Sequence, residues 1–501
     1  MLLSLLLGIG CPPKVDPEPA VVAAVEDPGL EPIVLPVDGT QIVYLNATFH
    51  AGSAHDPEGK QGLAWITAEL MKTGGAGALM PDEVQTQLFA LGAEIEVVVD
   101  KDLVTFRGKA LREDMPAFLP LFAETITSPG MDESAFYRAV DSAKSQVQSG
   151  ILESDEALGD AVLDKVLNEG HPYWHPVQGL PSGIDNIAIE DVKTFHKAAY
   201  DQAGLSFGLA GAVDEPLVAD FVKAMEALPV GEDEGLTSAE RKTFDTRQLV
   251  VIERNTNATG AHFGHPLDVT RSHPDYPALL VAMTAYGAHR ESYGRLFREM
   301  RGDRGLNYGD YAYIEHYRQV SVRDPSQLLG TLRAQPQFSV WVRPTDPEDA
   351  PFAVKMAIVM TEELVATGLT QEEFDSTRTH LLKRKKLWAK DPGRRLGYAV
   401  EAASLDQPNI LEDLDEALQE LTVEQVNAAI KAHIHPEQFQ VVVVSGDGPK
   451  FATTILKTYE TPMTYKTSAP NSEQAEEDKR YATYRFEPTA WTIIEADKAF
   501  D

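Results

Sequence analysis

Histidines are the side chains in this sequence best suited to metal binding and proton transfer, because neutral imidazole is available near pH 7. The chain has 13 of them, and neither H-E-x-x-H nor its inverted form H-x-x-E-H occurs. His171 and His175 are four residues apart in HPYWHP, but the prolines prevent the helix that would align them. Two looser pairs lack an acidic residue at ligand spacing: His262 with His265, and His433 with His435. We therefore expect none of these histidines to bind a metal.

The segment GLAWITAELMKTGG, residues 62–75, has the spacing of a metal-binding helix but not its side chains. Its apolar residues at 63, 66, 70 and 71 recur at helical spacing, so we predict an amphipathic helix that ends at the glycine pair. Residues four apart lie on one face of a helix, where zinc peptidases place two histidine ligands, with a glutamate base beside one of them. Here Trp65, Ala68 and Glu69 occupy these three positions.

Nucleophilic and phosphate chemistry find no support in the sequence. There is no G-x-S-x-G elbow, the one cysteine is Cys11, and KTGG at Lys72 has no accompanying S-x-x-K. The glycine-rich GGAGAL lacks the Gly-Lys-Ser/Thr ending of a phosphate-binding loop.

The formal net charge of −33 at pH 7 limits the possible partners. Binding to nucleic acids or to anionic membrane surfaces requires clustered Lys and Arg, so we expect neither as a partner. Neutral or basic partners remain possible. With 501 residues the chain is too long for one ordinary core, and its single cysteine permits no intrachain disulfide.

Cys11 follows a short apolar run, MLLSLLLGIG, and precedes a proline-rich acidic stretch that cannot form a core. This arrangement resembles a bacterial lipoprotein signal in which Cys11 is lipidated; an ordinary cleaved signal peptide is the alternative. We expect residues 1–31 to be a leader and linker, and the protein to be periplasmic or anchored to the outer membrane. Membrane contact would come only through the lipid, because no other run approaches the roughly 20 apolar residues of a spanning helix.

An internal duplication organises the rest of the chain. The 28 residues from Ile187, IAIEDVKTFHKAAYDQAGLSFGLAGAVD, align without gaps with LTVEQVNAAIKAHIHPEQFQVVVVSGDG from Leu421. PGMDESAFYRAV from Pro129 and TGLTQEEFDSTR from Thr367 share a second pattern. The two offsets, 234 and 238 residues, are nearly equal, which indicates one architecture used twice.

We therefore predict two homologous α+β domains, each a layer of helices on an antiparallel-rich sheet. Strand-like runs that begin at Gln41 and Gln248 lie near the start of each half. The expected divisions are a first domain at 32–232, an acidic linker at 233–245, a second domain at 246–456 and a poorly ordered tail at 457–501.

Four segments carry a resemblance to a known family: FHAGSAHDPEGKQGLAWITAELMKTGG, LFALGAEIEVVVDKDLVTFRGKAL, HPYWHPVQGLPSGIDNIAIEDVKTFHKAAY and YGRLFREMRGDRGLNYGDYAY. Together they resemble the insulinase or pitrilysin family of inverzincin zinc peptidases, especially the bacterial members akin to mitochondrial processing peptidase. The resemblance covers about residues 40 to 450 and implies a tandem of two homologous domains.

The resemblance implies that the zinc site has been lost from this chain. Active members carry H-x-x-E-H where this sequence has Trp65, Ala68 and Glu69, and a later glutamate completes their ligands. The corresponding helix here, AVDSAKSQVQ from Ala139, contains no glutamate. Since zinc requires at least three protein ligands, we expect no metal or other cofactor in this chain and zinc in a partner subunit.

The second half departs less from the family. In paired members an arginine and a tyrosine seven residues later reach toward the substrate held at the partner's zinc, and RGDRGLNY supplies Arg301 and Tyr308 at that spacing. Both groups could hold a peptide carbonyl or a developing oxyanion. The alternative is that they only shape the turn.

The leading hypothesis is a zinc-less subunit of a heterodimeric metallopeptidase, whose partner is a homologue with H-x-x-E-H and whose substrate is a peptide or unfolded protein. A purely structural or peptide-binding pseudo-peptidase is the second, and an autonomous peptidase with an unrecognised site is the third.

Overall fold

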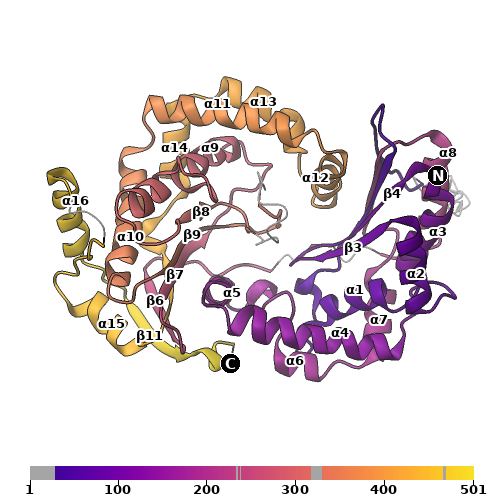
Figure 1. Cartoon of the computed structure of the whole chain (residues 1–501), viewed down its shortest axis with the longest axis horizontal. Helices are drawn as coiled ribbons and strands as arrows, with labels where there is room; N and C mark the ends of the chain where they lie inside the picture. The colour runs from indigo at the N-terminus through magenta and orange to yellow at the C-terminus, as the bar shows by residue number, and fades with distance from the viewer. Residues whose placement is uncertain (1–28, 233–234, 237–238, 318–329, 467–469, 501) are drawn as a thin grey trace, which may run out of the picture.

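The computed structural model describes residues 29–232, 235–236, 239–317, 330–466 and 470–500. Cys11 and most of the expected leader lie outside these residues. The chain forms two halves, each a mixed sheet covered by helices, and they face each other across the centre of the molecule (Figure 1). The predicted α+β fold with two similar layered domains is confirmed.

The first sheet has five strands in the order β1-β5-β2-β4-β3. Only β1 and β5 run parallel; the other neighbours are antiparallel. The strands are β1 (Ile33–Pro36), β2 (Ile42–Phe49), β3 (Glu94–Val99), β4 (Val104–Leu111) and β5 (Leu205–Gly211). Strand β3 therefore forms one edge of this sheet.

The second sheet repeats this plan and adds one strand, in the order β11-β6-β10-β7-β9-β8. Its strands are β6 (Gln248–Glu253), β7 (Thr259–Pro266), β8 (Tyr311–Tyr313), β9 (Gln337–Thr345), β10 (Gln440–Ser445) and β11 (Ala490–Glu495). The parallel pair β6 and β10 matches β1 and β5, and the antiparallel strands follow in the same order. The run from Gln41 is thus β2, whose counterpart is β7, whereas the run from Gln248 is β6.

The first half contains eight α-helices among its described residues. They are α1 (Leu63–Thr73), α2 (Pro81–Leu91), α3 (Met115–Thr127), α4 (Glu133–Ser145), α5 (Asp155–Leu167), α6 (Pro181–Asp185), α7 (Ile189–Ala199) and α8 (Glu215–Met225). A π-helical segment, Gln146–Leu152, continues α4.

The described part of the second half also contains eight. They are α9 (Tyr276–Gly287), α10 (Ala350–Thr367), α11 (Gln371–Trp388), α12 (Pro392–Ser404), α13 (Ile410–Glu420), α14 (Val423–His433), α15 (Gly448–Lys457) and α16 (Ser472–Thr483). A second π-helical segment spans Phe297–Gly302. None of the helices in the described ranges is both long enough and apolar enough to cross a bilayer.

The two halves exchange one helix each. Helix α5 packs on β7 and β10 of the second sheet, whereas α12 packs on β1, β2 and β5 of the first (Figure 1). Leu158 and Val162 of α5 join Val444 in one buried cluster. Gly159 permits the close approach, because a Cβ there would lie 2.7 Å from the ring of His262. Each helix has 13 residues and holds the same place in its repeat.

Helix α12 makes the reciprocal contact. Leu396 and Val400 are buried against Ala210 of β5, in a small cluster separate from the main core of either half. Both halves therefore need a helix from the other to cover their sheets, although each of these helices belongs to the opposite half of the chain.

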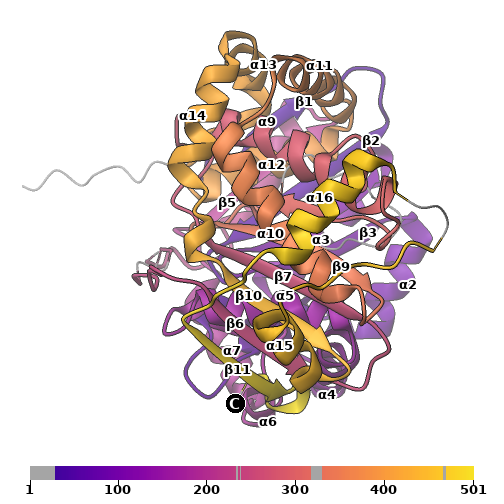
Figure 2. The same cartoon turned by 90° about the vertical axis from the view of Figure 1, so that its left-hand side faces the viewer.

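The prediction of a poorly ordered tail is wrong for most of residues 457–501. Strand β11 pairs in parallel with β6 from Ala490 to Glu495, and α16 lies over α10 (Figure 2). Arg304, which is fully buried, binds Glu477 at 2.8 Å and Asp478 at 2.7 Å. The charged APNSEQAEEDKR suggested disorder, but two of its acidic residues bind the buried Arg304, and the buried Tyr481 anchors the helix.

Replacing Tyr481 by alanine tests this anchoring. Its ring is 1% exposed and packs edge-on against Phe352, so Tyr481→Ala should lower the free energy of unfolding by about 3 kcal/mol. Tyr459, also in the tail but 62% exposed, provides the matched control; Tyr459→Ala should change it by less than about 0.5 kcal/mol. Urea denaturation measures both, and equal effects would contradict an ordered tail.

Candidate functional site

Helix α1 is fixed at its N-terminus by a buried carboxylate. Asp56 accepts hydrogen bonds from the backbone N–H of Gly62 at 2.6 Å and of Ala64 at 2.7 Å. These are donors that the helix itself leaves unpaired, and the helix dipole favours a negative charge there. Gly62 has a φ of 112°, which suits glycine. The predicted helix is confirmed, and its N-terminus is held by hydrogen bonds to Asp56.

The three positions of the degenerate motif have different surroundings. Trp65 is half-buried and lines a cavity between the two halves. Ala68 is fully buried in the core, and the carboxylate of Glu69 is bound by Lys72 at 2.8 Å. Gln146, which follows α4 in AVDSAKSQVQ, lines the same cavity with an amide instead of a carboxylate. The residues of this helix pair therefore do not fit a zinc ion.

The cavity beside Trp65 has a volume of about 420 Å³ and draws its walls from both halves. Helices α1 and α5 and the π-helical segment line one side, and strand β9 with the residues around it lines the other. Its polar and aromatic residues include Trp65, Gln146, Asp160, His262, His316 and Trp341.

A buried ion cluster forms the floor of this cavity. Arg333 donates from Nε to Asp100 at 2.7 Å, and its Nη1 lies 3.4 Å from Asp164. Lys101 Nζ is 4.0 Å from the same Asp164 carboxylate. All four side chains are less than a tenth exposed. Burial alone would raise the pKa of Asp100, but the charge of Arg333 outweighs it and holds that pKa well below its usual range.

The HPYWHP loop completes this network through its backbone. Lys101 Nζ donates to the carbonyl of Tyr173 at 2.8 Å and also to that of His175. The Tyr173 hydroxyl donates to Asp102, whose carboxylate also accepts the backbone N–H of Ala334 at 3.0 Å. The loop is a short 3-10 turn, and both of its histidines are buried.

The carboxyl of Asp160 also lines this cavity. Desolvation, and then the nearby charge of Asp164, raise the pKa of Asp160 above its usual range. Its neighbour His262 is 3.8 Å away, and burial lowers the pKa of that imidazole to about 3. The sequence analysis missed Asp160, because a carboxylate on the polar face of a helix has no local signal that it faces a cavity.

The structure brings Arg301 and Tyr308 together on the surface of the second half. Arg301 lies in the π-helical segment and donates from Nη1 to the carbonyl of Tyr308 at 3.1 Å. Its guanidinium stacks over the rings of Phe297 and Tyr308, at 4.7 and 5.6 Å. Tyr308 is 74% exposed. Neither residue lines the cavity beside Trp65.

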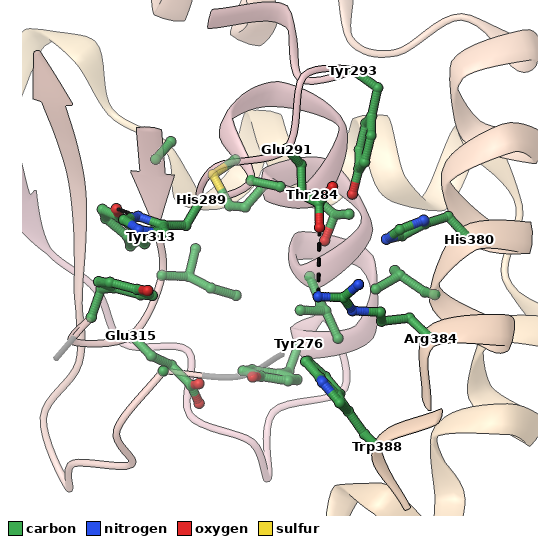
Figure 3. A pocket seen from close by; sticks show the side chains of 18 residues that line it. Tyr276, Thr284, His289, Glu291, Tyr293, Tyr313, Glu315, His380, Arg384 and Trp388 are labelled. Atoms are coloured by element: carbon green, nitrogen blue, oxygen red, sulfur yellow. Dashed lines mark hydrogen bonds and ion pairs between the residues drawn. The ribbon is translucent and has the colours of Figure 1, made fainter. Parts of the chain in front are cut away.

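A second cavity lies within the second half and is shown in Figure 3. It has a volume of about 100 Å³ and is enclosed mainly by aromatic and titratable side chains from α9, α11 and the residues around β8. Arg384 projects into the centre of the view and lies 3.6 Å from Glu291. None of the residues predicted from sequence lines this cavity.

A third cavity, of about 550 Å³, separates α12 from strands β3 and β4. Glu94 and Glu96 of β3 and Glu401 of α12 line it. The basic partners on β4 are Lys109 and Arg107, which lie opposite the two β3 glutamates in the register. Because β3 is the edge of its sheet, the backbone groups on its outer side have no strand partner among the described residues.

Comparison with known families identifies the fold. The insulinase (peptidase family M16) profile matches residues 33–172, and the peptidase M16 inactive-domain profile matches residues 186–381. The chain belongs to peptidase family M16. The family assignment made from sequence is thus confirmed. The first match lies within the first half, and the second runs from α7 of the first half to α11 of the second.

Individual relatives are distant. An uncharacterised zinc protease of Streptomyces coelicolor is 24% identical over 54% of this chain and 60% of its own length. The uncharacterised zinc protease YmxG of Bacillus subtilis is 19% identical over 81% of this chain and 93% of its own length. The β subunit of the mitochondrial processing peptidase of Saccharomyces cerevisiae is 24% identical over 41% of this chain and 45% of that protein.

A solved M16 structure shares the fold. The peptidase M16 inactive domain from Pseudomonas fluorescens superposes with a TM-score of 0.73 at 23% identity, over 83% of this chain and 95% of that one. The two-domain M16 architecture thus extends across most of the chain.

Removing the central charge of the ion cluster should destabilise the protein strongly. Arg333→Ala leaves Asp100 and Asp164 buried without their main counter-charge, so we expect the free energy of unfolding to fall by about 3–5 kcal/mol. The matched control is Arg107→Ala, because Arg107 forms a 3.8 Å pair with Glu96 in which both side chains are about half exposed or more; its effect should stay below about 1 kcal/mol.

The loss of stability caused by Arg333→Ala should depend on pH. Because the folded-state pKa of Asp100 is lowered, its stabilisation is complete above the ordinary carboxyl pKa of about 4 and is lost as the pH falls below it. Urea denaturation at pH 7 and at pH 3 should therefore show a smaller effect of Arg333→Ala in acid. If Arg333→Ala lowers the free energy of unfolding equally at both pH values, the ion pair of Arg333 and Asp100 does not have the assigned stabilising role.

Proposed function

We propose that this chain is the zinc-less subunit of a heterodimeric metallopeptidase. One observation carries the proposal: helix α1 retains its N-terminal anchor and its place beside the central cavity, yet Trp65, Ala68 and Glu69 supply no ligand set. A homologous partner with H-x-x-E-H would supply zinc and the general base. The substrate would be a peptide or an unfolded protein chain.

The exposure of Arg301 and Tyr308 supports a contribution to the partner's site. A tyrosine that only shapes a turn is expected to bury its ring, but the ring of Tyr308 is 74% exposed. Arg304, three residues after Arg301, shows the contrast, because its buried guanidinium binds α16. The side chains of Arg301 and Tyr308 are thus accessible from outside their own half, where they would act as preorganised donors to a carbonyl or oxyanion.

Two of the comparisons support an assembly of unequal subunits. The yeast relative is named as one subunit of a processing peptidase, and the Pseudomonas structure is named an inactive domain. The first name describes one subunit of a peptidase, and the second describes an M16 domain without activity.

A peptide-binding pseudo-peptidase without a catalytic role is the second candidate. The edge strand β3 favours it, because an extended peptide can add to an uncovered edge through backbone hydrogen bonds. The adjacent cavity is lined by both acidic and basic side chains, among them Glu94, Glu96, Glu401, Arg107 and Lys109, so a peptide with polar side chains would suit it. This function requires neither Arg301 nor Tyr308.

The two candidates differ in their dependence on Arg301 and Tyr308. The chain alone should not cleave unfolded protein. In the reconstituted pair, Arg301→Ala and Tyr308→Phe should each lower turnover by about 10²-fold, the effect of losing one oxyanion donor. Arg298→Ala is the matched control, because Arg298 is an exposed arginine of the same π-helical segment. Proteolysis of an unfolded substrate is the measurement, with thermal melts of each variant.

Unchanged turnover in both variants, with the pair assembled, would exclude the catalytic contribution and leave the pseudo-peptidase. Cleavage by the isolated chain would overturn both candidates. An equal loss in Arg298→Ala would assign the effect to the local fold instead of to the two donors.

We further propose that the mature protein is a lipoprotein of the cell envelope, attached through Cys11. The support is the sequence alone: an apolar run precedes this cysteine and a proline-rich acidic stretch follows it. Lipid attachment should place the protein in the membrane fraction, and Cys11→Ser should release it or block its maturation. Mass spectrometry of the mature N-terminus is the direct check, and a mature form that lacks Cys11 would contradict the anchor.

A further inference from the structure

We propose a divalent-metal site of the zinc type on the second half, formed by His273, Asp275 and His433. It is unrelated to the degenerate motif on α1 and independent of the proposed peptidase role. One donor atom from each residue lies within 4.8 Å of the others. His273 and Asp275 belong to the turn before α9, and His433 is the last residue of α14, so tertiary packing alone brings them together.

The carboxylate of Asp275 lies between the two imidazoles. Its Oδ2 is 2.7 Å from Nε2 of His433 and 4.0 Å from Nδ1 of His273. A tetrahedral zinc ion about 2.0–2.1 Å from each donor would separate the donors by about 3.3 Å. The two observed distances bracket this value, and the donor atoms of the two imidazoles also lie within 4.8 Å of each other.

The donor nitrogen of His273 would exchange one partner for the metal. Its Nδ1 accepts a hydrogen bond from the backbone N–H of Asp275 at 3.1 Å, and the ion would take the place of that N–H on the single in-plane lone pair of the nitrogen. The ring of His433 stands at 84° to that of His273, with centroids 5.0 Å apart. The two nitrogens can therefore approach one ion from different directions.

Access and charge also favour a cation. The three side chains are between 20% and 43% exposed, so an ion and its water ligands can reach them. The nearby Arg271 does not neutralise Asp275, because its buried guanidinium binds Glu315 at 2.8 Å and Glu401 at 3.5 Å. Two imidazoles and one carboxylate form a set that zinc accepts with a fourth, open position.

The metal would act as a clip within the second half. It would join the start of α9 to the end of α14, which are more than a hundred residues apart in the chain. Tyr276, the residue after Asp275, lines the cavity of Figure 3, so the clip would also hold one wall of that cavity. A ligand that binds only the folded state stabilises it by mass action.

Zinc titration of the full-length protein tests the site. Isothermal titration calorimetry in excess Mg²⁺, which occupies sites made of carboxylates alone, should find one Zn²⁺ per chain at this site. His273→Gln, Asp275→Asn and His433→Gln should each weaken that binding at least tenfold. His435→Gln is the matched control, because His435 is a half-exposed histidine two residues along, beside Glu437 at 3.4 Å; it should bind zinc like the wild type.

Thermal melting with and without EDTA gives a second readout. Zinc should raise the midpoint of the wild type and of His435→Gln, and should leave the three ligand variants unshifted. The melts in EDTA show that each variant folds; if one does not, the other two decide the outcome. Wild-type affinity in the ligand variants, or the same loss in His435→Gln, would overturn the proposal.

Discussion

The contact of Arg333 with Asp100 and Asp164 is the constraint on which the arrangement of the two halves depends. It joins the turn after β3, helix α5 and the approach to β9, three segments far apart in the chain. In a low-dielectric interior, opposite charges attract strongly and an unpaired charge is very unfavourable. Alternative packings of the halves would separate these partners, so the cluster selects one relative position and with it the shape of the cavity beside Trp65.

Hydrophobic packing supports the same arrangement from both sides of the cluster. Helices α5 and α12 each cover the sheet of the opposite half, and both contacts are apolar. Such burial stabilises strongly but with little directionality, whereas the ion cluster is directional and adds specificity. None of Trp65, Ala68 and Glu69 on α1 takes part in the ion cluster or in the two helix contacts.

Local patterns predicted local structure well. The apolar spacing in residues 62–75 gave helix α1, Leu63–Thr73, and the internal duplication predicted two sheets of one topology. The prediction for the tail was wrong, because the position of α16 depends on two acidic residues that bind the buried Arg304. The sequence also did not predict that Asp160 lines a cavity or that His273, Asp275 and His433 lie together. Periodicity reports which face of an element is buried, but it does not report which distant side chain will lie opposite a polar one.

The exchange of helices has a consequence for biosynthesis. Strand β5 ends at Gly211 and α12 ends at Ser404, so about 190 residues must be translated before the first sheet receives its cover. At about 5–20 residues per second, this delay is on the order of ten to forty seconds. During that time an apolar surface around Ala210 is open to chaperones or to a second nascent chain. The N-terminal half therefore cannot reach its final fold before α12 has been translated.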